Sequence, residues 1–246
     1  MRSDLYEDMY KTEEKHWWHR AKRRIVGRFI TSYCHEKNPN ILDVGCGTGK
    51  NMDALQKQGD VWGIDISQEA LLYCKKRGLT QIKKGSAENI PFDSEIFDVV
   101  CALDVLEHVD DISAVKEIKR IIKNNGYIII TVPAFDWLWS KWDEVLHHKR
   151  RYTKETLSEL LRAEGFTIKK NTYMHSFLVV PIFLMRKIKE RQKKHYDSDF
   201  QINNNGMNIF FSGLSKLEQW WINRYDMPFG TSVLCIAQKE PQKSPL

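Results

Sequence analysis

Strand-like and helix-like patterns of apolar residues alternate along the chain. Strand-like segments lie at residues 41–44, 61–66, 81–84, 97–103, 127–132, 166–170 and 232–238. Apolar residues at helical spacing fill intervals between them, at 50–55, 68–77, 112–123 and 153–164. Strands that alternate with helices predict an α/β domain, in which a largely parallel sheet is covered by helices on both faces.

The first strand leads into a loop with three glycines. Residues 41–44 are apolar apart from one acid, and glycines follow at positions 45, 47 and 49. Glycine allows a sharp turn and a close approach to a ligand, because it has no Cβ. A strand, a glycine turn and a helix N-terminus together form a nucleotide-type site in an open α/β sheet.

Two classes of ligand compete for this loop. A dinucleotide site needs the spacing G-x-G-x-x-G/A, but Lys50 stands where its third small residue should be. The spacing D-x-G-x-G-x-G at 43–49 instead resembles motif I of the class I S-adenosylmethionine (SAM)-dependent methyltransferases. The resemblance implies a Rossmann-like, seven-stranded methyltransferase sheet, with SAM as cofactor and S-adenosylhomocysteine as product. The loop residues that it assigns to the methionine end of SAM are Asp43, Gly45, Cys46 and Gly47.

The second strand carries an acid at its end. A carboxylate in this position can accept hydrogen bonds from both hydroxyls of a ribose. Both classes of ligand therefore predict that Asp65 binds ribose, and we place Ile66 beside it in the cofactor site. The segment after the third strand resembles the methyltransferase loop that lies against adenine, although Ser86 replaces the usual acid there. Ser86, Ala87 and Glu88 are the residues that we assign to it.

The fourth strand opens into Asp104-Val-Leu-Glu-His-Val, which resembles the LEHV signature of the same family. Residues at the carboxyl end of a central strand face the ligand crevice, so Leu103 and Asp104 join the predicted cofactor site. An Asp-x-x-Glu-His cluster also suits a divalent metal, but Glu107 and His108 could equally cap a helix. We therefore assign no metal.

Residues 1–34 form a predicted helical cap with paired tryptophans and several arginines. Such a segment could close over SAM, and an arginine in it could pair with the cofactor's carboxylate. We assign Trp18 and Arg23 to this role, although helical phase does not separate Arg23 from Arg20 or Arg24.

Residues 137–152 combine tryptophans, acids, two adjacent histidines and a basic run just after the fifth strand. Loops on the crevice side of a sheet carry specificity, so this segment is a candidate substrate lid, or else part of the core. Histidine suits the general base that a hydroxyl acceptor would need near neutral pH. The candidate catalytic residues are His108, His147 and His148.

Residues 171–230 depart from the minimal fold and read as a helical insertion before the last strand, at 231–239, of a single domain spanning 1–246. The apolar stretch 177–185 is too short to cross a membrane, and six basic residues follow it by position 194. This pattern fits either a peripheral contact with a membrane surface or a core helix with a solvated end.

The bulk properties narrow the class of protein. The chain has 246 residues and a net charge of +6, with no nucleic-acid-binding motif, so we predict no nucleic-acid partner. Its five cysteines show no C-x-x-C pair and predict reduced thiols in the cytoplasm. The expected location is the cytoplasm, with a peripheral contact on the inner face of the membrane if residues 177–194 bind it.

The resemblance covers roughly residues 35–170 and implies a methyltransferase of EC class 2.1.1. The HWW opening and the WLWS…HHKRRYT segment resemble bacterial enzymes of glycan and lipid-linked saccharide pathways. We expect a small-molecule, glycan or lipid-linked acceptor, with oxygen as the favoured acceptor atom. The alternatives are a catalytically silent SAM-binding partner protein and an O-methyltransferase of quinone precursors.

Overall fold

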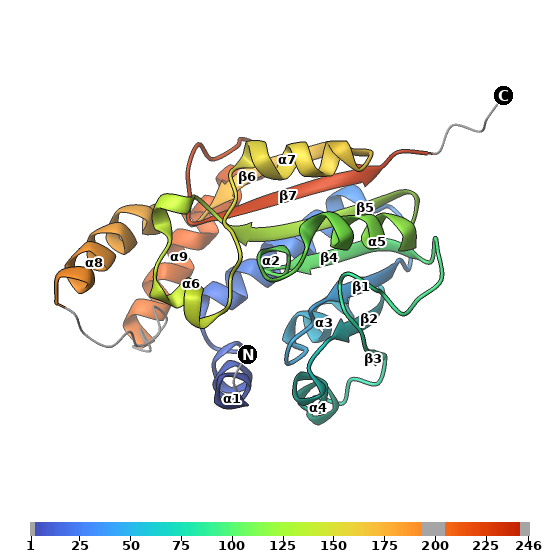
Figure 1. The fold of residues 1–246 in the computed structure, drawn as a ribbon, viewed down its shortest axis with the longest axis horizontal. Helices are drawn as coiled ribbons and strands as arrows, with labels where there is room; N and C mark the ends of the chain where they lie inside the picture. The colour runs from blue at the N-terminus through green and yellow to red at the C-terminus, as the bar shows by residue number, and fades with distance from the viewer. Residues whose placement is uncertain (1–2, 193–204, 242–246) are drawn as a thin grey trace.

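The computed structural model describes residues 3–192 and 205–241 and confirms the predicted α/β fold (Figure 1). Seven strands form one sheet in the order β3-β2-β1-β4-β5-β7-β6, with only β7 antiparallel to its neighbours. Their bounds are β1 Asn40–Val44, β2 Asp60–Asp65, β3 Ile82–Lys84, β4 Phe97–Leu103, β5 Ile122–Pro133, β6 Phe166–Met174 and β7 Ser232–Lys239.

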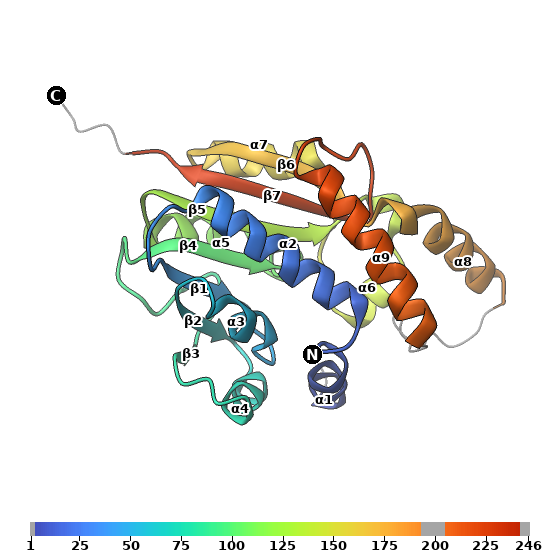
Figure 2. The same ribbon diagram turned by 180° about the vertical axis from the view of Figure 1, so that it is seen from behind.

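Helices cover both faces of the sheet. The longer ones are α1 Ser3–Thr12, α2 Trp17–Tyr33, α4 Gln68–Lys76, α5 Asp111–Ile121, α7 Lys154–Ala163, α8 Val179–Gln192 and α9 Asn205–Ile222, and the shorter are α3 Lys50–Leu55, α6 Lys141–Val145 and three single 3₁₀ turns. Helices α5 and α7 lie on one face, and α2 and α9 cross the other (Figures 1 and 2). Helices α8 and α9 project beyond the sheet at the end where its parallel strands terminate.

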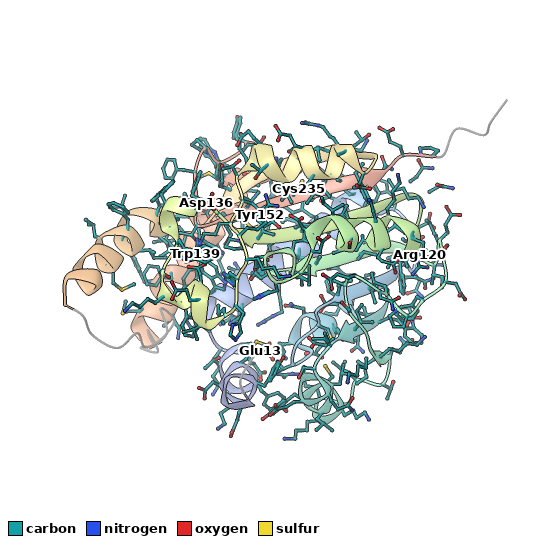
Figure 3. All side chains as sticks on the ribbon, in the orientation of Figure 1. Glu13, Arg120, Asp136, Trp139, Tyr152 and Cys235 are labelled. Carbon is teal, nitrogen blue, oxygen red and sulfur yellow. The ribbon has the colours of Figure 1, made fainter. Side chains whose placement is uncertain are left out.

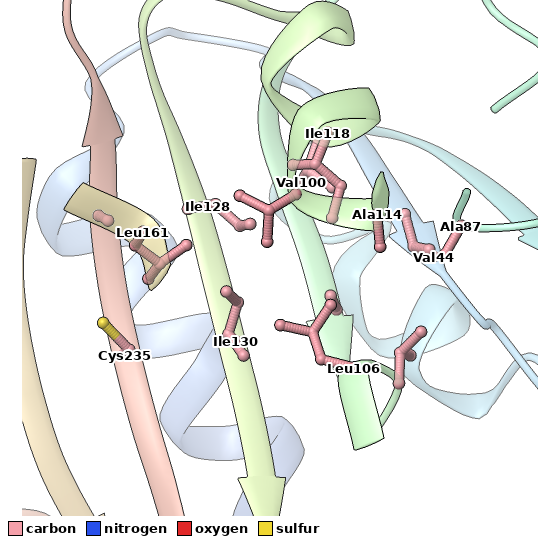
Figure 4. Packing of buried hydrophobic residues seen from close by; sticks show 14 of the residues in the cluster. Val44, Ala87, Val100, Leu106, Ala114, Ile118, Ile128, Ile130, Leu161 and Cys235 are labelled. Atoms are coloured by element: carbon pink, nitrogen blue, oxygen red, sulfur yellow. The ribbon is translucent and has the colours of Figure 1, made fainter. Parts of the chain in front are cut away.

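Alternation along the central strands divides the core into two layers. Val100 and Ile128 point toward α5 and α7, where they join a fully buried cluster with Ile118 and Leu161 (Figure 4). Their neighbours Val99 and Ile129 belong to the cluster under α2 and α3. This two-sided burial explains why strands β4 and β5 are nearly continuous apolar runs.

Three boundaries differ from those that the pattern predicts. Strand β6 continues to Met174, four residues beyond the predicted end. Strand β5 includes the predicted turn at 124–126, where Asn125 adopts a left-handed conformation with φ of 65°. Helix α9 begins at Asn205, inside the predicted loop 197–208, of which the first part lies outside the described residues. Within the described ranges, no helix is long and apolar enough to cross a membrane.

The strand order reverses between β1 and β4, which both pair with their neighbours in parallel. A ligand crevice forms at such a reversal, outside the carboxyl ends of the strands. The glycine loop, Asp65, Asp104 and the end of β6 all lie at this edge of the sheet.

Candidate active site

The glycine loop takes the backbone shape that only glycine adopts readily. Gly45, Gly47 and Gly49 have φ values of 67°, 55° and 85°, in the left-handed region that side chains with a Cβ disfavour. A Cβ on Gly47 would stand 2.6 Å from Cε of Met9, and one on Gly45 would stand 2.7 Å from Val105. The loop therefore turns sharply and lies in close contact with Met9 and Val105, as a ligand-binding loop requires.

Asp65 connects the glycine loop with the start of α4. One carboxylate oxygen accepts a hydrogen bond from the backbone N–H of Gly47 at 2.9 Å, and the other accepts one from Ser67 at 2.8 Å. Each carboxylate oxygen can accept a second bond, so the group can also receive two ribose hydroxyls. Ile66 beside it is 70% exposed and offers an apolar surface to the same ligand.

Asp43 lies beneath the loop without a partner. It is 1% exposed, and neither carboxylate oxygen accepts a hydrogen bond from the described residues. Burial, and then the nearby Asp65 and Glu13, raise its pKa to about 8. A buried carboxyl without a partner is unfavourable, and a cationic ligand over the loop would relieve it.

The predicted adenine segment forms a compact turn. The Ser86 hydroxyl accepts a hydrogen bond from the backbone N–H of Glu88 at 3.2 Å, and Ala87 between them is buried. The Glu88 carboxylate accepts the backbone N–H of Asp110 at 2.7 Å, at the start of α5. The segment is thus fixed against α5, with Glu88 itself exposed at the rim of the crevice.

Helix α1 and the turn after it dock on the glycine loop. Glu13 is buried in this turn (Figure 3), where it accepts hydrogen bonds from the Thr48 hydroxyl and from Arg77, the latter at 2.5 Å. Arg23 donates to the backbone carbonyl of Glu13 at 2.7 Å. The N-terminal cap therefore covers the loop through specific polar contacts.

The structure separates the three arginines that helical phase left equivalent. Arg20 is exposed, and Arg24 turns toward Gln219 of α9. Arg23 faces the loop region, where its Nη1 atom is buried without a hydrogen-bond acceptor among the described residues. An unsatisfied buried guanidinium N–H suits an anionic group such as a carboxylate. Of the three arginines, Arg23 alone fits the predicted role.

Asp104, at the end of β4, forms the centre of the second half of the crevice. It adopts a left-handed φ of 58°, accepts a hydrogen bond from Thr131 at 2.8 Å and pairs with Lys22 of α2. Although burial raises the pKa of Asp104, Lys22 and Thr131 outweigh it and hold the pKa below its ordinary value. Leu103 beside it is 8% exposed. Nothing in the sequence pattern singled out Lys22 for this pair.

His148 is oriented by a buried ion pair. Its Nδ1 lies 2.8 Å from Asp143, whose carboxylate also accepts two hydrogen bonds from Arg151 at 2.8 and 2.9 Å. The rings of His148 and His108 meet edge to face with centroids 4.7 Å apart. Burial, followed by the neighbouring His148, lowers the pKa of His108 to about 4. The segment after β5 thus folds over the end of β4, where its Lys149 N–H donates to the carbonyl of Glu107 at 2.7 Å.

The two adjacent histidines of this segment differ in their surroundings. His147 has a left-handed φ of 58° and is exposed, so only His148 joins His108. Glu107 lies beside them, 1% exposed with one carboxylate oxygen unpartnered. The donor atoms of Glu107, His108 and His148 lie within 4.8 Å of one another, a spacing that could also hold a metal ion.

His175 is a further residue of the crevice that the sequence analysis missed. It follows β6 directly, is 2% exposed, and stacks on Trp18 with ring centroids 4.0 Å apart. Neither ring nitrogen has a hydrogen-bond partner among the described residues, and burial, then Lys22, lowers its pKa to about 3. Placing the end of β6 at 174 rather than 170 would have put this histidine at the same edge as Asp65 and Asp104.

Comparisons with known proteins agree with this geometry. A family model described as a methyltransferase domain matches residues 42–130. An uncharacterised protein of Methanocaldococcus jannaschii is 29% identical over 174 residues, which cover 68% of this chain and 74% of that protein. The ubiquinone biosynthesis O-methyltransferase of Paraburkholderia phymatum is 34% identical over 112 residues, 42% of this chain and 48% of that enzyme.

Solved structures share the fold over almost the whole chain. The methyltransferase in complex with the Trm112 methyltransferase activator of Haloferax volcanii matches with a TM-score of 0.63 at 15% identity, covering 99% of this chain and 96% of that one. A SAM-dependent methyltransferase of Thermotoga maritima gives 0.59 at 19% identity, with 96% and 95% covered. The family model begins inside β1 and ends inside β5, so it spans the glycine loop, Asp65 and Asp104. Residues 42–130 thus carry a methyltransferase domain in a chain with the fold of SAM-dependent methyltransferases, and this domain and fold imply SAM as the cofactor.

Proposed function

We propose that this methyltransferase moves the methyl group of SAM to a hydroxyl of a small-molecule or lipid-linked acceptor that lies over the ends of β4 and β6. The observation that carries the proposal is the Asp143–His148 pair beside His108, next to Asp104. A carboxylate that accepts the Nδ1 proton of a histidine leaves its Nε2 free to accept another proton. A hydroxyl acceptor needs such a base.

The first half of the crevice would hold the cofactor. Asp65 would receive the ribose, Arg23 the carboxylate and Asp43 the positive charge of the methionine end, and the free acceptor capacity of Asp65 and the unsatisfied buried atoms of Arg23 and Asp43 support these roles. SAM supplies a methyl group activated by its sulfonium, so the transfer depends chiefly on how the acceptor is positioned. The predicted adenine contacts are Ser86, Ala87 and Glu88.

In the second half, the chain's own residues would position the acceptor and remove its proton. His148 is the proposed base, and Asp143 and Arg151 fix its orientation. His108 is held neutral by burial, so it can line the acceptor pocket without repelling the cationic cofactor. His175, also neutral, with its Nδ1 3.8 Å from the Glu218 carboxylate, would contact the acceptor from the β6 side.

The test is methyl transfer from labelled SAM to a panel of phenols, sugars and lipid-linked saccharides. His148→Ala should lower kcat by about a hundredfold or more, the usual contribution of a general base, with unchanged SAM affinity. Asp143→Asn should reduce kcat less, and His147→Ala, the exposed neighbour, is the matched control. Equal activity of the His148 and His147 variants would refute the assignment of the base.

Treatment with a chelator separates a base from a metal ligand at the same residues. A base needs no ion, so activity after chelation should be unchanged. If activity is lost and then restored by a divalent cation, Glu107, His108 and His148 are ligands instead.

Two other functions remain candidates. The 34% identity to a ubiquinone biosynthesis O-methyltransferase favours a quinone precursor as a phenolic acceptor, although the match covers 48% of that enzyme. A catalytically silent SAM-binding partner would bind SAM as tightly but transfer no label to any extract. The solved relative in complex with an activator protein is a reason to repeat a negative assay with the chain's own cell extract added.

A further inference from the structure

Helix α9 has two faces of opposite character. Its buried side carries polar residues, since Ser215, Glu218 and Gln219 are 8% exposed or less, together with the fully buried Ile222. Its outer side is apolar, with exposures between 46% and 75%. The outer residues are Ile209, Phe210, Leu217, Trp220 and Trp221. At 3.6 residues per turn these five fall on one half of the helix surface, and we call them the α9 face.

The buried side of α9 is fixed to the candidate acceptor site. Glu218 accepts the backbone N–H groups of His175 and Ser176 at 2.8 and 2.7 Å. Gln219 donates to the carbonyl of Ala21 in α2 at 2.9 Å. These contacts hold the helix in one orientation, so the α9 face points away from the site that its other side supports.

The α9 face has no negative charge. Glu218 is the only acid of the helix, and it is buried. The charged groups beside the face are Lys216 and, just beyond the helix, Arg224 and Asp226, all exposed, with Asp226 paired to Lys170 at 2.7 Å. Tyr225 continues the aromatic surface, with its ring centroid 5.0 Å from that of Trp221. The surface thus combines apolar and amphipathic aromatic side chains with cations.

A groove with two arginines adjoins this surface between α2 and α9. It has a volume of about 690 Å³ and is lined by Arg28, Ser32, Tyr33, Trp220, Asn223 and Arg224. The Arg224 guanidinium lies 4.8 Å from the ring of Trp220. Neither arginine has a carboxylate partner among the described residues. Two guanidinium groups with hydroxyl and amide neighbours suit a phosphate group.

Helix α8 supports the same occupant. Leu178 and half-buried Phe177 belong to the interior, since Phe177 packs against Trp17 and Phe211. Val180 and Leu184, by contrast, are 63% and 54% exposed at the projecting end of the molecule. The sequence of α8 then becomes basic, although the side chains from 186 onward lie outside the described residues.

We propose that the α9 face and the adjoining arginine groove dock on an anionic phospholipid membrane, with the groove on lipid phosphates and the tryptophans at the headgroup level. Tryptophan and tyrosine prefer this interface, and a surface helix with an apolar face and flanking cations binds it. Each cation near an anionic leaflet adds to the affinity.

The experiment is sedimentation of the full chain with vesicles of phosphatidylcholine alone and of phosphatidylcholine with phosphatidylglycerol. The wild type should bind only the anionic vesicles, more weakly as salt rises, and its tryptophan emission should shift to the blue. Arg28→Glu with Arg224→Glu should weaken binding by about tenfold or more, and Trp220→Ser with Trp221→Ser should abolish the emission shift.

Matched controls lie on the other side of the molecule. Leu72→Ser and Lys75→Glu replace exposed residues of α4 and should leave vesicle binding unchanged. SAM affinity should be the same in every variant, which shows that each is folded and separates this test from that of the methyl transfer. Failure of the wild type to bind anionic vesicles at low salt would overturn the proposal. So would a dimer, seen by light scattering, that the tryptophan substitutions dissociate, because a second copy would then be the occupant.

Discussion

The two halves of the crevice treat charge in opposite ways. In the half formed by β1, β2 and the glycine loop, burial raises the pKa of Asp43, Asp65 and Glu13. These acids outnumber the cations that reach them. SAM carries a positive sulfonium and an ammonium group, so its binding would supply the positive charge that this half of the crevice lacks.

The half formed by the ends of β4 and β6 already contains its own cation. Lys22 pairs with Asp104, and the histidines around this pair are held neutral, with the pKa of His108 lowered to about 4 and that of His175 to about 3 by burial. The Lys22–Asp104 pair is therefore balanced without a ligand, although burial, and then Asp104, raise the pKa of Glu107 beside it. Substitutions in the first half should therefore change cofactor affinity, and those in the second should change stability and turnover.

The largest effect should follow removal of the ribose carboxylate. Asp65→Ala eliminates a charged acceptor for both hydroxyls, at about 1.5–3 kcal/mol each, so calorimetric titration should show SAM affinity falling by roughly a hundredfold or more. Asp60→Ala, at the opposite end of the same strand, is the matched control, because the Asp60 side chain accepts a hydrogen bond from Gln81 and lies away from the glycine loop. Unchanged SAM affinity in the Asp65 variant would remove this residue from the cofactor half.

The same division marks what the sequence could predict. The centre of the cofactor half is local, since a strand, a glycine loop and an acid at the next strand end lie within 41–66, while Glu13 and Arg23 reach it from the N-terminal cap. Backbone conformation and hydrogen bonds then place the residues of 41–66 together without help from distant segments, and the prediction of the fold is confirmed.

The acceptor half depends on contacts between segments far apart in the chain. Lys22 reaches Asp104 across 82 residues, and Glu218 reaches His175 across 43. Neither pairing has a local pattern, because helical phase fixes the direction of a side chain but not the element that it meets. His147 and His148 are adjacent and looked equivalent, yet a left-handed residue at 147 turns only the second one inward.

The next largest effect should come from the ion pair of the second half. Lys22→Met leaves Asp104 without its cation, and we expect a loss of about 1–3 kcal/mol in the free energy of unfolding, since Asp104 is partly exposed. At about 2–4 °C per kcal/mol for a chain of this size, thermal denaturation resolves it. Lys11→Met breaks an exposed pair with Glu7 and should leave the melting temperature unchanged.

A double variant completes that test. If Lys22 acts through Asp104, adding Asp104→Asn to Lys22→Met should recover part of the lost stability, measured without SAM. Additive losses would mean that Lys22 stabilises the protein through its packing in α2, and the second half would then lack a functional cation of its own.

A smaller effect distinguishes the backbone strain of the glycine loop from its contact with Met9 of α1. Gly47→Ala meets both a left-handed φ of 55° and Met9 at 2.6 Å, whereas Gly78→Ala meets a φ of 80° with open space around it. Each should lose about 1–2 kcal/mol to backbone strain. Only Gly47→Ala should also lower SAM affinity, and adding Met9→Ala should improve its stability. Equal behaviour of the two variants would show that α1 does not rest on the loop in solution.

The last predicted effect is a pH dependence that belongs to the cofactor half alone. Asp43 in the folded chain keeps its proton up to about pH 8, whereas in the unfolded chain it ionises near its ordinary value of about 3.9. Because the raised pKa favours the unfolded state once the group can ionise there, its contribution to stability is full below that value and is lost as pH rises toward 8. Asp43→Asn cannot ionise and escapes this loss. Without SAM, the melting temperature of the variant relative to wild type should therefore rise between about pH 5 and about pH 8, by about 2–4 °C for each kcal/mol that the wild type loses. With SAM the difference should reverse, since a cation over the loop favours the ionised carboxylate that only the wild type has.

A difference that is the same at both pH values, with and without SAM, would mean that Asp43 is a packing residue of β1 and that the cofactor half has no excess of acid for SAM to balance.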